Sequence, residues 1–129
     1  MRLLHVGLTS SSEKNADRFF GELLGMEKSE PKKISAALAK TIFQADSEYK
    51  VINYSGGHVH FEIFIGGSEK SNARQIAHVC LGVNDLAAFL SKCRTLKVSV
   101  SQVPRGDSFL TFVRDDAGNI FEIKERKVG

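Results

Sequence analysis

The sequence predicts an α+β fold in which two βαβββ modules form a curved mixed sheet. Two short motifs occur once in each half of the chain: His5-Val6 with Phe61-Glu62-Ile63, and then His78-Val79 with Phe121-Glu122-Ile123. Both halves also show the same order of predicted elements, a strand, a helix and three further strands. A repeat whose halves differ mainly in loop length is typical of a duplicated module.

The composition favours one compact domain, residues 1–129, built from repeats at about 1–66 and 74–126. A chain of 129 residues that is 42% hydrophobic and 26% charged can bury a core of its own. The segment at about 66–73 is rich in glycine and serine, so it is the predicted linker between the repeats.

Charge and hydropathy exclude several classes of partner. The net charge is only +3 and the basic residues are scattered, so we expect no nucleic-acid partner. No run approaches the ~18 apolar residues of a membrane span, so we expect no membrane partner. The N-terminus lacks the apolar run of a signal peptide, and we expect a cytoplasmic protein. Cys80 and Cys93 are then expected to be reduced core residues.

The predicted elements of the first repeat begin with a strand at 3–9. Ser10 and Glu13 have the spacing of a capping box for the helix that follows, and Gly25 is its predicted stop. Three strands follow, at 34–43, 48–54 and 59–65.

The second repeat has the same order of predicted elements. A strand at 75–83 precedes a helix whose cap is Asn84 or Asp85. The remaining strands are predicted at 98–103, 108–113 and 119–125, with a tight turn at 115–119 before the last of them.

The alternation of side chains predicts which residues face away from the helices. The wholly apolar face of each opening strand needs burial, so His5 and His78 should lie on the opposite face. Glu62 and Glu122 alternate in the same way with apolar neighbours, and His60 shares the face of Glu62. We therefore expect the two histidines and two glutamates to face a common metal-binding cleft.

Each of these residues alone has a simpler explanation. A single strand histidine is usually a satisfied polar residue, and a single strand glutamate usually faces solvent. The joint pattern at matched ends of matched halves favours a shared site, with metal ligands His5, Glu62, His78 and Glu122. His60 would be a pocket wall or a substitute ligand, whereas His58, beside the Gly56-Gly57 turn, is more simply an edge residue.

Two imidazoles and two carboxylates suit one divalent ion per site, Ni²⁺, Co²⁺, Zn²⁺, Fe²⁺ or Mn²⁺, without selecting among them. Such an ion can act as a Lewis acid on substrate oxygens, and a glutamate beside it can serve as a general base.

At these residues the chain resembles the vicinal oxygen chelate superfamily, which includes glyoxalase I, bleomycin-resistance proteins and extradiol dioxygenases. The resemblance covers nearly the whole chain. The segments that carry it, besides the doubled element order, are His5-Val6-Gly7-Leu8, Leu24-Gly25-Met26, Ala77-His78-Val79 and Asp115-Asp116-Ala117-Gly118-Asn119-Ile120-Phe121-Glu122-Ile123.

Within that superfamily the opening Met1-Arg2-Leu3-Leu4-His5 looks most like short bacterial glyoxalase I, the lactoylglutathione lyases. The resemblance implies the same four metal ligands, a thiol–methylglyoxal hemithioacetal substrate and a 2-hydroxyacyl thioester product. It implies Glu122 or Glu62 as the group that moves the proton. It also implies a homodimer, with the site within one chain or shared between two.

The four metal-ligand positions distinguish this chain from several relatives. Two positions that contact substrate in glutathione-dependent glyoxalases are occupied by other residues here. Methylmalonyl-CoA epimerases usually have Gln at the position of Glu62, whereas three-ligand relatives lack one of the four. Glutathione-dependent glyoxalases usually have Arg where this chain has Thr9, and Asn where it has Gly66. Thr9 and His60 are therefore the candidate substrate-binding residues, and the thiol is left open. An epimerase-type enzyme and a non-enzymatic binding protein are the alternatives.

Overall fold

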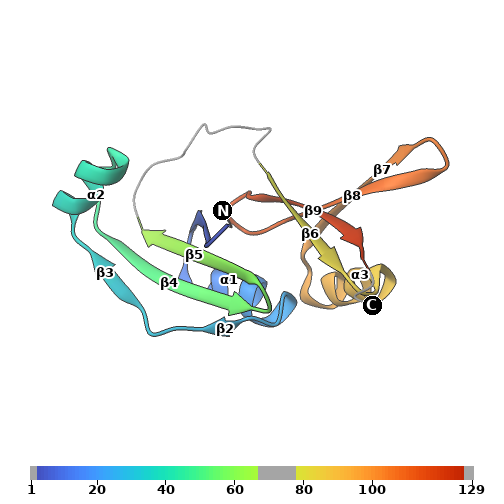
Figure 1. The fold of residues 1–129 in the computed structure, drawn as a ribbon, viewed down its shortest axis with the longest axis horizontal. Helices are drawn as coiled ribbons and strands as arrows, with labels where there is room; N and C mark the ends of the chain where they lie inside the picture. Colours follow the sequence, from blue (N-terminus) through green and yellow to red (C-terminus); the bar gives the residue numbers. More distant parts are fainter. Residues whose placement is uncertain (1–2, 67–77, 127–129) are drawn as a thin grey trace. The chain divides into compact units, whose positions relative to one another are not determined.

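The computed structural model describes residues 3–66 and 78–126, apart from the side chains of Ile42 and Phe43. The chain divides into two compact units, Met1–Asn72 and Ala73–Gly129. The predicted linker after Gly66 and the start of the strand predicted at 75–83 lie outside the described residues. Each unit combines a mixed sheet with at least one helix (Figure 1), so the predicted α+β class is confirmed.

The first unit is built on a five-stranded sheet. Its central path has the order β1-β5-β4-β2, and β3 pairs with β4 beside β2. β1 runs parallel to β5, and the other pairs are antiparallel. The strands are β1 (Val6–Ser10), β2 (Glu27–Lys28), β3 (Lys32–Ile34), β4 (Tyr49–Gly56) and β5 (Val59–Gly66).

One continuous helical segment packs on this sheet, comprising α1 (Glu13–Ala16) and the π-helical η1 (Asp17–Leu23). The predicted capping box is wrong, because the N-cap is Ser12, whose side chain accepts from Asn15 N at 3.1 Å. The predicted stop is right: Gly25 has a φ of 68°, which costs glycine little.

The core of the first unit lies between this helix and one face of the sheet. The ring of Phe20 contacts those of Tyr54 and Phe61, with centroids 5.4 and 5.3 Å away. All three side chains are fully buried. Because Tyr54 and Phe61 are strand partners on β4 and β5, burial of this face leaves the alternate residues of both strands on the other side.

The strand predicted at 34–43 is wrong. Residues Ala36–Phe43 form the helix α2, with Ser35 as N-cap accepting from Leu38 N at 3.2 Å. Three alanines, a leucine and a lysine in this segment are strong helix formers, and this propensity outweighs the β-branched residues at its ends. The strand that directly precedes α2 is the short β3, and the sequence predicts neither β3 at 32–34 nor β2.

The second unit has a four-stranded sheet with the order β6-β9-β8-β7. β6 runs parallel to β9, and the other two pairs are antiparallel. β7 is an edge strand whose seven residues are all exposed, and it includes Pro104. The strands are β6 (His78–Val83), β7 (Ser99–Arg105), β8 (Ser108–Arg114) and β9 (Ile120–Glu125).

Helix α3 (Leu86–Leu96) packs against β7 and β9. Its N-cap is Asp85, one of the two predicted candidates, which accepts from Ala88 N at 2.9 Å. Cys93 on α3 is buried as predicted, and burial raises the pKa of its thiol. The prediction for Cys80 is wrong: it is a free thiol but exposed, because it alternates with Val79 and Leu81 on β6.

The two sheets repeat the same connectivity and the same register. Val6 pairs with Phe61 in the first unit, and Val79 pairs with Phe121 in the second. The motifs recognised in the sequence are therefore parallel strand partners in both units. Within the described part of the chain, no helix is long and apolar enough to cross a membrane.

Candidate functional site

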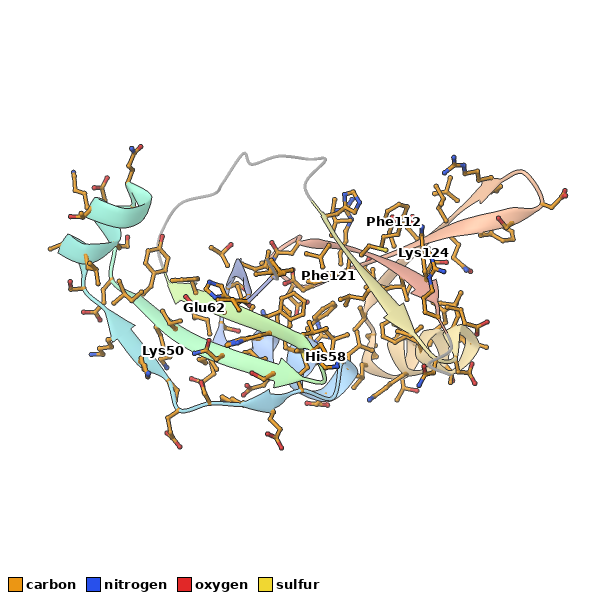
Figure 2. All side chains as sticks on the ribbon, in the orientation of Figure 1. Lys50, His58, Glu62, Phe112, Phe121 and Lys124 are labelled. Carbon is orange, nitrogen blue, oxygen red and sulfur yellow. The ribbon has the colours of Figure 1, made fainter. Side chains whose placement is uncertain are left out.

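In the first unit His5 and Glu62 form a pair on the sheet face opposite the helix. His5 immediately precedes β1, and its Nε2 lies 3.8 Å from Glu62 Oε2. Figure 2 shows Glu62 on β5. The pairing follows from the register, because Gly7 is the strand partner of Glu62 and His5 stands two residues earlier on the same face.

We call this surface the first His–Glu face; its residues are His5, Gly7, Thr9, Asn53, His60, Glu62 and Phe64. His60 Nε2 lies 2.7 Å from Asn53 Oδ1, so the amide oxygen fixes the orientation of this ring when Nε2 carries the proton. The rings of His5 and His60 have centroids 5.9 Å apart. His60 therefore lies beside the His–Glu pair, as the sequence predicts.

In the second unit His78 and Glu122 form the equivalent pair. His78 Nε2 lies 3.8 Å from Glu122 Oε1, and Lys124 Nζ lies 3.8 Å from the other carboxylate oxygen, Oε2. The ring of Phe112 stands edge-on to that of His78, at 6.5 Å between centroids. We call this surface the second His–Glu face; its residues are His78, Cys80, Gly82, Phe112, Glu122 and Lys124.

Each pair has donor atoms and spacing that fit a divalent ion. Two atoms that each bind one ion at about 2.1 Å are about 3.0 Å apart at a right angle and at most about 4.2 Å apart. The 3.8 Å separations fall inside that limit, so small side-chain adjustments would let one ion contact both members of a pair. An imidazole with a carboxylate is also a donor set that such ions accept.

The four predicted ligands occur as two pairs, one in each unit. Among residues 3–66 and 78–126, no group of three or more His, Cys, Asp and Glu side chains is gathered for metal binding. The predicted faces of all four residues are those observed, whereas a single four-ligand site stays a prediction.

The two positions that depart from glyoxalase I have clear structural settings. Thr9 is exposed on the first His–Glu face, as the partner of Phe64. Gly66 has a φ of 125°, and a Cβ there would lie 3.0 Å from the backbone oxygen of Glu48. This backbone conformation strains any residue with a side chain, so the structure explains glycine at this position. His58 is exposed at the β4–β5 turn, as predicted.

Sequence reasoning missed two residues near the pairs. Asn53 was not considered, although its place in the alternation of β4 puts it on the same face as Glu62, its strand partner. Lys124 was not considered either, although it follows Glu122 by two residues and so shares its face.

A separate charged cluster on the helix side of the first sheet ties α1 and η1 to the strands. Lys28 binds both Glu13 and Asp17, and Lys50 Nζ lies 2.9 Å from Glu13 Oε1. The two lysines hold the pKa of Glu13 below its usual range. The hydroxyl of Tyr54 donates to Asp17 Oδ1 at 2.8 Å, and burial together with this bond raises the pKa of Tyr54.

A family model of the Glyoxalase/Bleomycin resistance protein/Dioxygenase superfamily matches residues 2–123. The chain belongs to this superfamily. The superfamily's description names enzymes and a resistance protein together, so membership alone does not select an activity. No curated protein matches the chain.

Solved structures of the superfamily share the fold. A glyoxalase family protein from Bacillus cereus is similar with a TM-score of 0.74 at 16% identity, covering 99% of this chain and 95% of its own. A fosfomycin resistance protein from Listeria monocytogenes, complexed with Mn(II) and 1S,2S-dihydroxypropylphosphonic acid, has a TM-score of 0.70 at 14% identity, covering 95% and 88%. The trypanothione-dependent glyoxalase I of Leishmania major has a TM-score of 0.69 at 18% identity, covering 97% and 86%.

Proposed function

We propose that this protein is a metal-dependent lyase of the glyoxalase I type. It would convert a thiol–methylglyoxal hemithioacetal to a 2-hydroxyacyl thioester. The observation that carries the proposal is the pair of matched His–Glu contacts, each of 3.8 Å and each at the same register of its sheet. His5, Glu62, His78 and Glu122 would be the ligands of one divalent ion, Ni²⁺, Co²⁺, Zn²⁺, Fe²⁺ or Mn²⁺.

The reaction moves hydrogen between adjacent carbons and needs no oxidant. A base removes the proton from the carbon that carries sulfur and hydroxyl, and the proton is returned to the neighbouring carbonyl carbon. The hydroxyl proton passes to the former carbonyl oxygen, which leaves a thioester beside a new hydroxyl group. A bound divalent ion would supply Lewis acidity at the two substrate oxygens.

Glu122 is the first candidate for this base, with Glu62 as the second. Glu122 is the less exposed carboxylate, at 16% against 28% for Glu62, so less water surrounds it. A carboxylate in a less hydrated position transfers protons to substrate with less competition from solvent. His60 and Thr9, which share the face of Glu62, would contact the substrate.

A different carbon-acid substrate is the second candidate, and Thr9 and Gly66 favour it. Thr9 has no charge to hold a glutamyl carboxylate, and the backbone at Gly66 opposes the asparagine of glutathione-dependent enzymes. An epimerase-type reaction uses the same base and ion on another substrate. A binding protein without catalysis would need neither His–Glu pair. For each of these activities we propose a cytoplasmic homodimer.

Metal content separates the two metal-dependent enzymes from a binding protein without catalysis. Protein purified without chelator is analysed for bound metal, as wild type, as the His78→Ala/Glu122→Gln double variant and as His58→Ala, a control at an exposed turn. We expect about one ion per chain in wild type and in the control, and loss in the double variant. Two ions per chain would mean that each pair binds alone.

Turnover of methylglyoxal adducts of several thiols is then followed through thioester absorbance. We expect Glu122→Gln to lower the rate by at least about 100-fold. Bound metal without turnover of any thiol adduct would favour the second candidate. Failure to bind any of the five ions would overturn the enzymatic proposal.

A further inference from the structure

The second His–Glu face carries more positive than negative charge beside Glu122. Lys124 follows Glu122 on the same face of β9, with its side chain 51% exposed and its Nζ 3.8 Å from Glu122 Oε2. Figure 2 shows Lys124 on β9 and Phe112 on the neighbouring β8. A single lysine beside a carboxylate would be an ordinary surface ion pair, so a second charge is what matters.

Arg126 supplies that second charge. A Cβ added to Gly82 would lie 3.0 Å from both Cβ and Cγ of Arg126, so the arginine stem lies across the glycine. Gly82 is the strand partner of Lys124, and its position on β6 alternates with that of Val83. The arginine stem therefore crosses the strand beside Lys124, on the side of the sheet that carries Glu122.

The acid that lies between these two cations in the chain, Glu125, is engaged elsewhere. Glu125 belongs to the opposite face of β9, and its Oε1 accepts from Leu86 N at the start of α3. Glu122 is then the one carboxylate among the residues of the second His–Glu face, which also holds Lys124, and the stem of Arg126 lies over Gly82 of the same face. The equivalent positions of the first sheet hold Phe64 and Gly66, which carry no charge.

We propose that Lys124 and Arg126 form an anion-binding subsite that selects substrates carrying a carboxylate or phosphate group. The inference rests on the proposed function, which places the reacting carbons of the substrate next to Glu122. The subsite would hold the anionic end of the substrate while the reacting end faces the glutamate. Lys124 and Arg126 carry the positive charge for such a contact, which Thr9 does not.

The test compares thioesters that differ by one carboxylate. Titration calorimetry on metal-loaded protein uses the lactoyl thioester of N-acetylcysteamine, which is neutral, and that of N-acetylcysteine, which carries a carboxylate on the thiol part. The malyl thioester of N-acetylcysteamine carries the carboxylate on the acyl part. Comparing the two anionic ligands shows whether the subsite recognises the thiol part or the acyl part of the substrate. The variants are Lys124→Met, Arg126→Met and Lys124→Arg, with Lys92→Met on an exposed position of α3 as control.

We expect wild type and Lys92→Met to bind one of the anionic thioesters about tenfold more tightly than the neutral one. Lys124→Met and Arg126→Met should each reduce this preference about threefold or more, and Lys124→Arg should retain it. An unchanged preference in both methionine variants would overturn the inference, and so would equal affinity of wild type for all three ligands.

Inorganic phosphate separates this inference from the proposed function, because it needs no thiol site. Phosphate is titrated in parallel while the backbone amide resonances of positions 124 and 126 are followed by NMR. Saturable shifts in wild type that are lost in the double methionine variant support the subsite even when no thioester is turned over. Absence of such shifts, together with no preference for an anionic thioester, would overturn it while leaving metal-dependent turnover to stand or fall separately.

Discussion

His78 reaches Glu122 diagonally across two strands, because the strand partner of Glu122 is Cys80. The side chain at position 80 is therefore a neighbour of both members of the pair, beside His78 on β6 and across from Glu122 on β9. We expect Cys80→Leu to lower metal affinity about tenfold, because a larger residue would displace His78 or Glu122. Cys80→Ala should keep wild-type metal content in elemental analysis. Loss of metal in Cys80→Ala would instead identify the thiol as a ligand.

Asn53 should act on catalysis through His60 rather than through the metal. Asn53→Ala removes the oxygen that lies 2.7 Å from His60 Nε2, so the ring loses its fixed orientation. We expect kcat/KM to fall about tenfold with bound metal unchanged, as measured by steady-state kinetics and elemental analysis. Ser91→Ala, at an exposed position of α3, is the control. A parallel loss of metal would show that His60 is a ligand.

Placing asparagine at position 66, as in glutathione-dependent glyoxalases, should destabilise the protein. Gly66→Asn forces a side chain onto a φ of 125° with a backbone oxygen 3.0 Å from the new Cβ. We expect a loss of about 2 kcal/mol in the free energy of unfolding, measured by urea denaturation. Gly57→Asn is the matched control, because its φ is 56° and nothing lies within 4 Å of the added Cβ. Equal costs at the two sites would contradict this explanation of Gly66.

Tyr54→Phe should cost about 1 kcal/mol at neutral pH, because the hydroxyl donates to Asp17 inside the helix-side cluster. The variant should also change the alkaline limit of stability. Folding raises the pKa of Tyr54 above its usual 10.0, chiefly by burial and then through Asp17. The unfolded chain therefore loses this proton at lower pH than the folded chain does.

The contribution of Tyr54 is fully present below pH 10.0 and is lost as pH rises through the folded-state pKa. Above pH 10 we expect the wild type to lose about 1.4 kcal/mol per pH unit more than Tyr54→Phe does. Urea denaturation at pH values from about 8 to about 11 measures this difference. Tyr49→Phe, on the opposite face of β4, serves as control. Parallel pH profiles for wild type and Tyr54→Phe would refute the assignment.

The faces of the strands could be predicted from the sequence because they depend on a period of two. Phe61 and Ile63 alternate with Glu62, and any burial of the first two forces Glu62 to the other side. The same rule places Glu122, and it holds even where the strand bounds shift by a residue. The sequence therefore predicts the faces of the candidate ligands without their contacts.

The sequence could not decide features for which two local preferences compete or which depend on strand pairing. Segment 34–43 contains β-branched residues, which favour a strand, and an alanine-rich stretch, which favours a helix. The N-cap Ser35 adds to the helical preference, and the segment forms a helix. Ser10, Ser11 and Ser12 all have cap chemistry, and only the path of the chain selects Ser12. The contact of His60 with Asn53 depends on the pairing of β4 with β5, which is information that neither strand carries alone.

The exposed edge strand β7 has a consequence for how the protein behaves at high concentration. An edge strand offers unpaired backbone groups to any passing chain, and all seven residues of β7 are exposed. Pro104 has no N–H to offer, and Arg105 adds a charge at the end of the strand. Both features oppose edge-to-edge growth of the sheet into fibres. Replacing Pro104 with valine should therefore shorten the lag time of aggregation in a thioflavin assay, whereas folding should be unaffected.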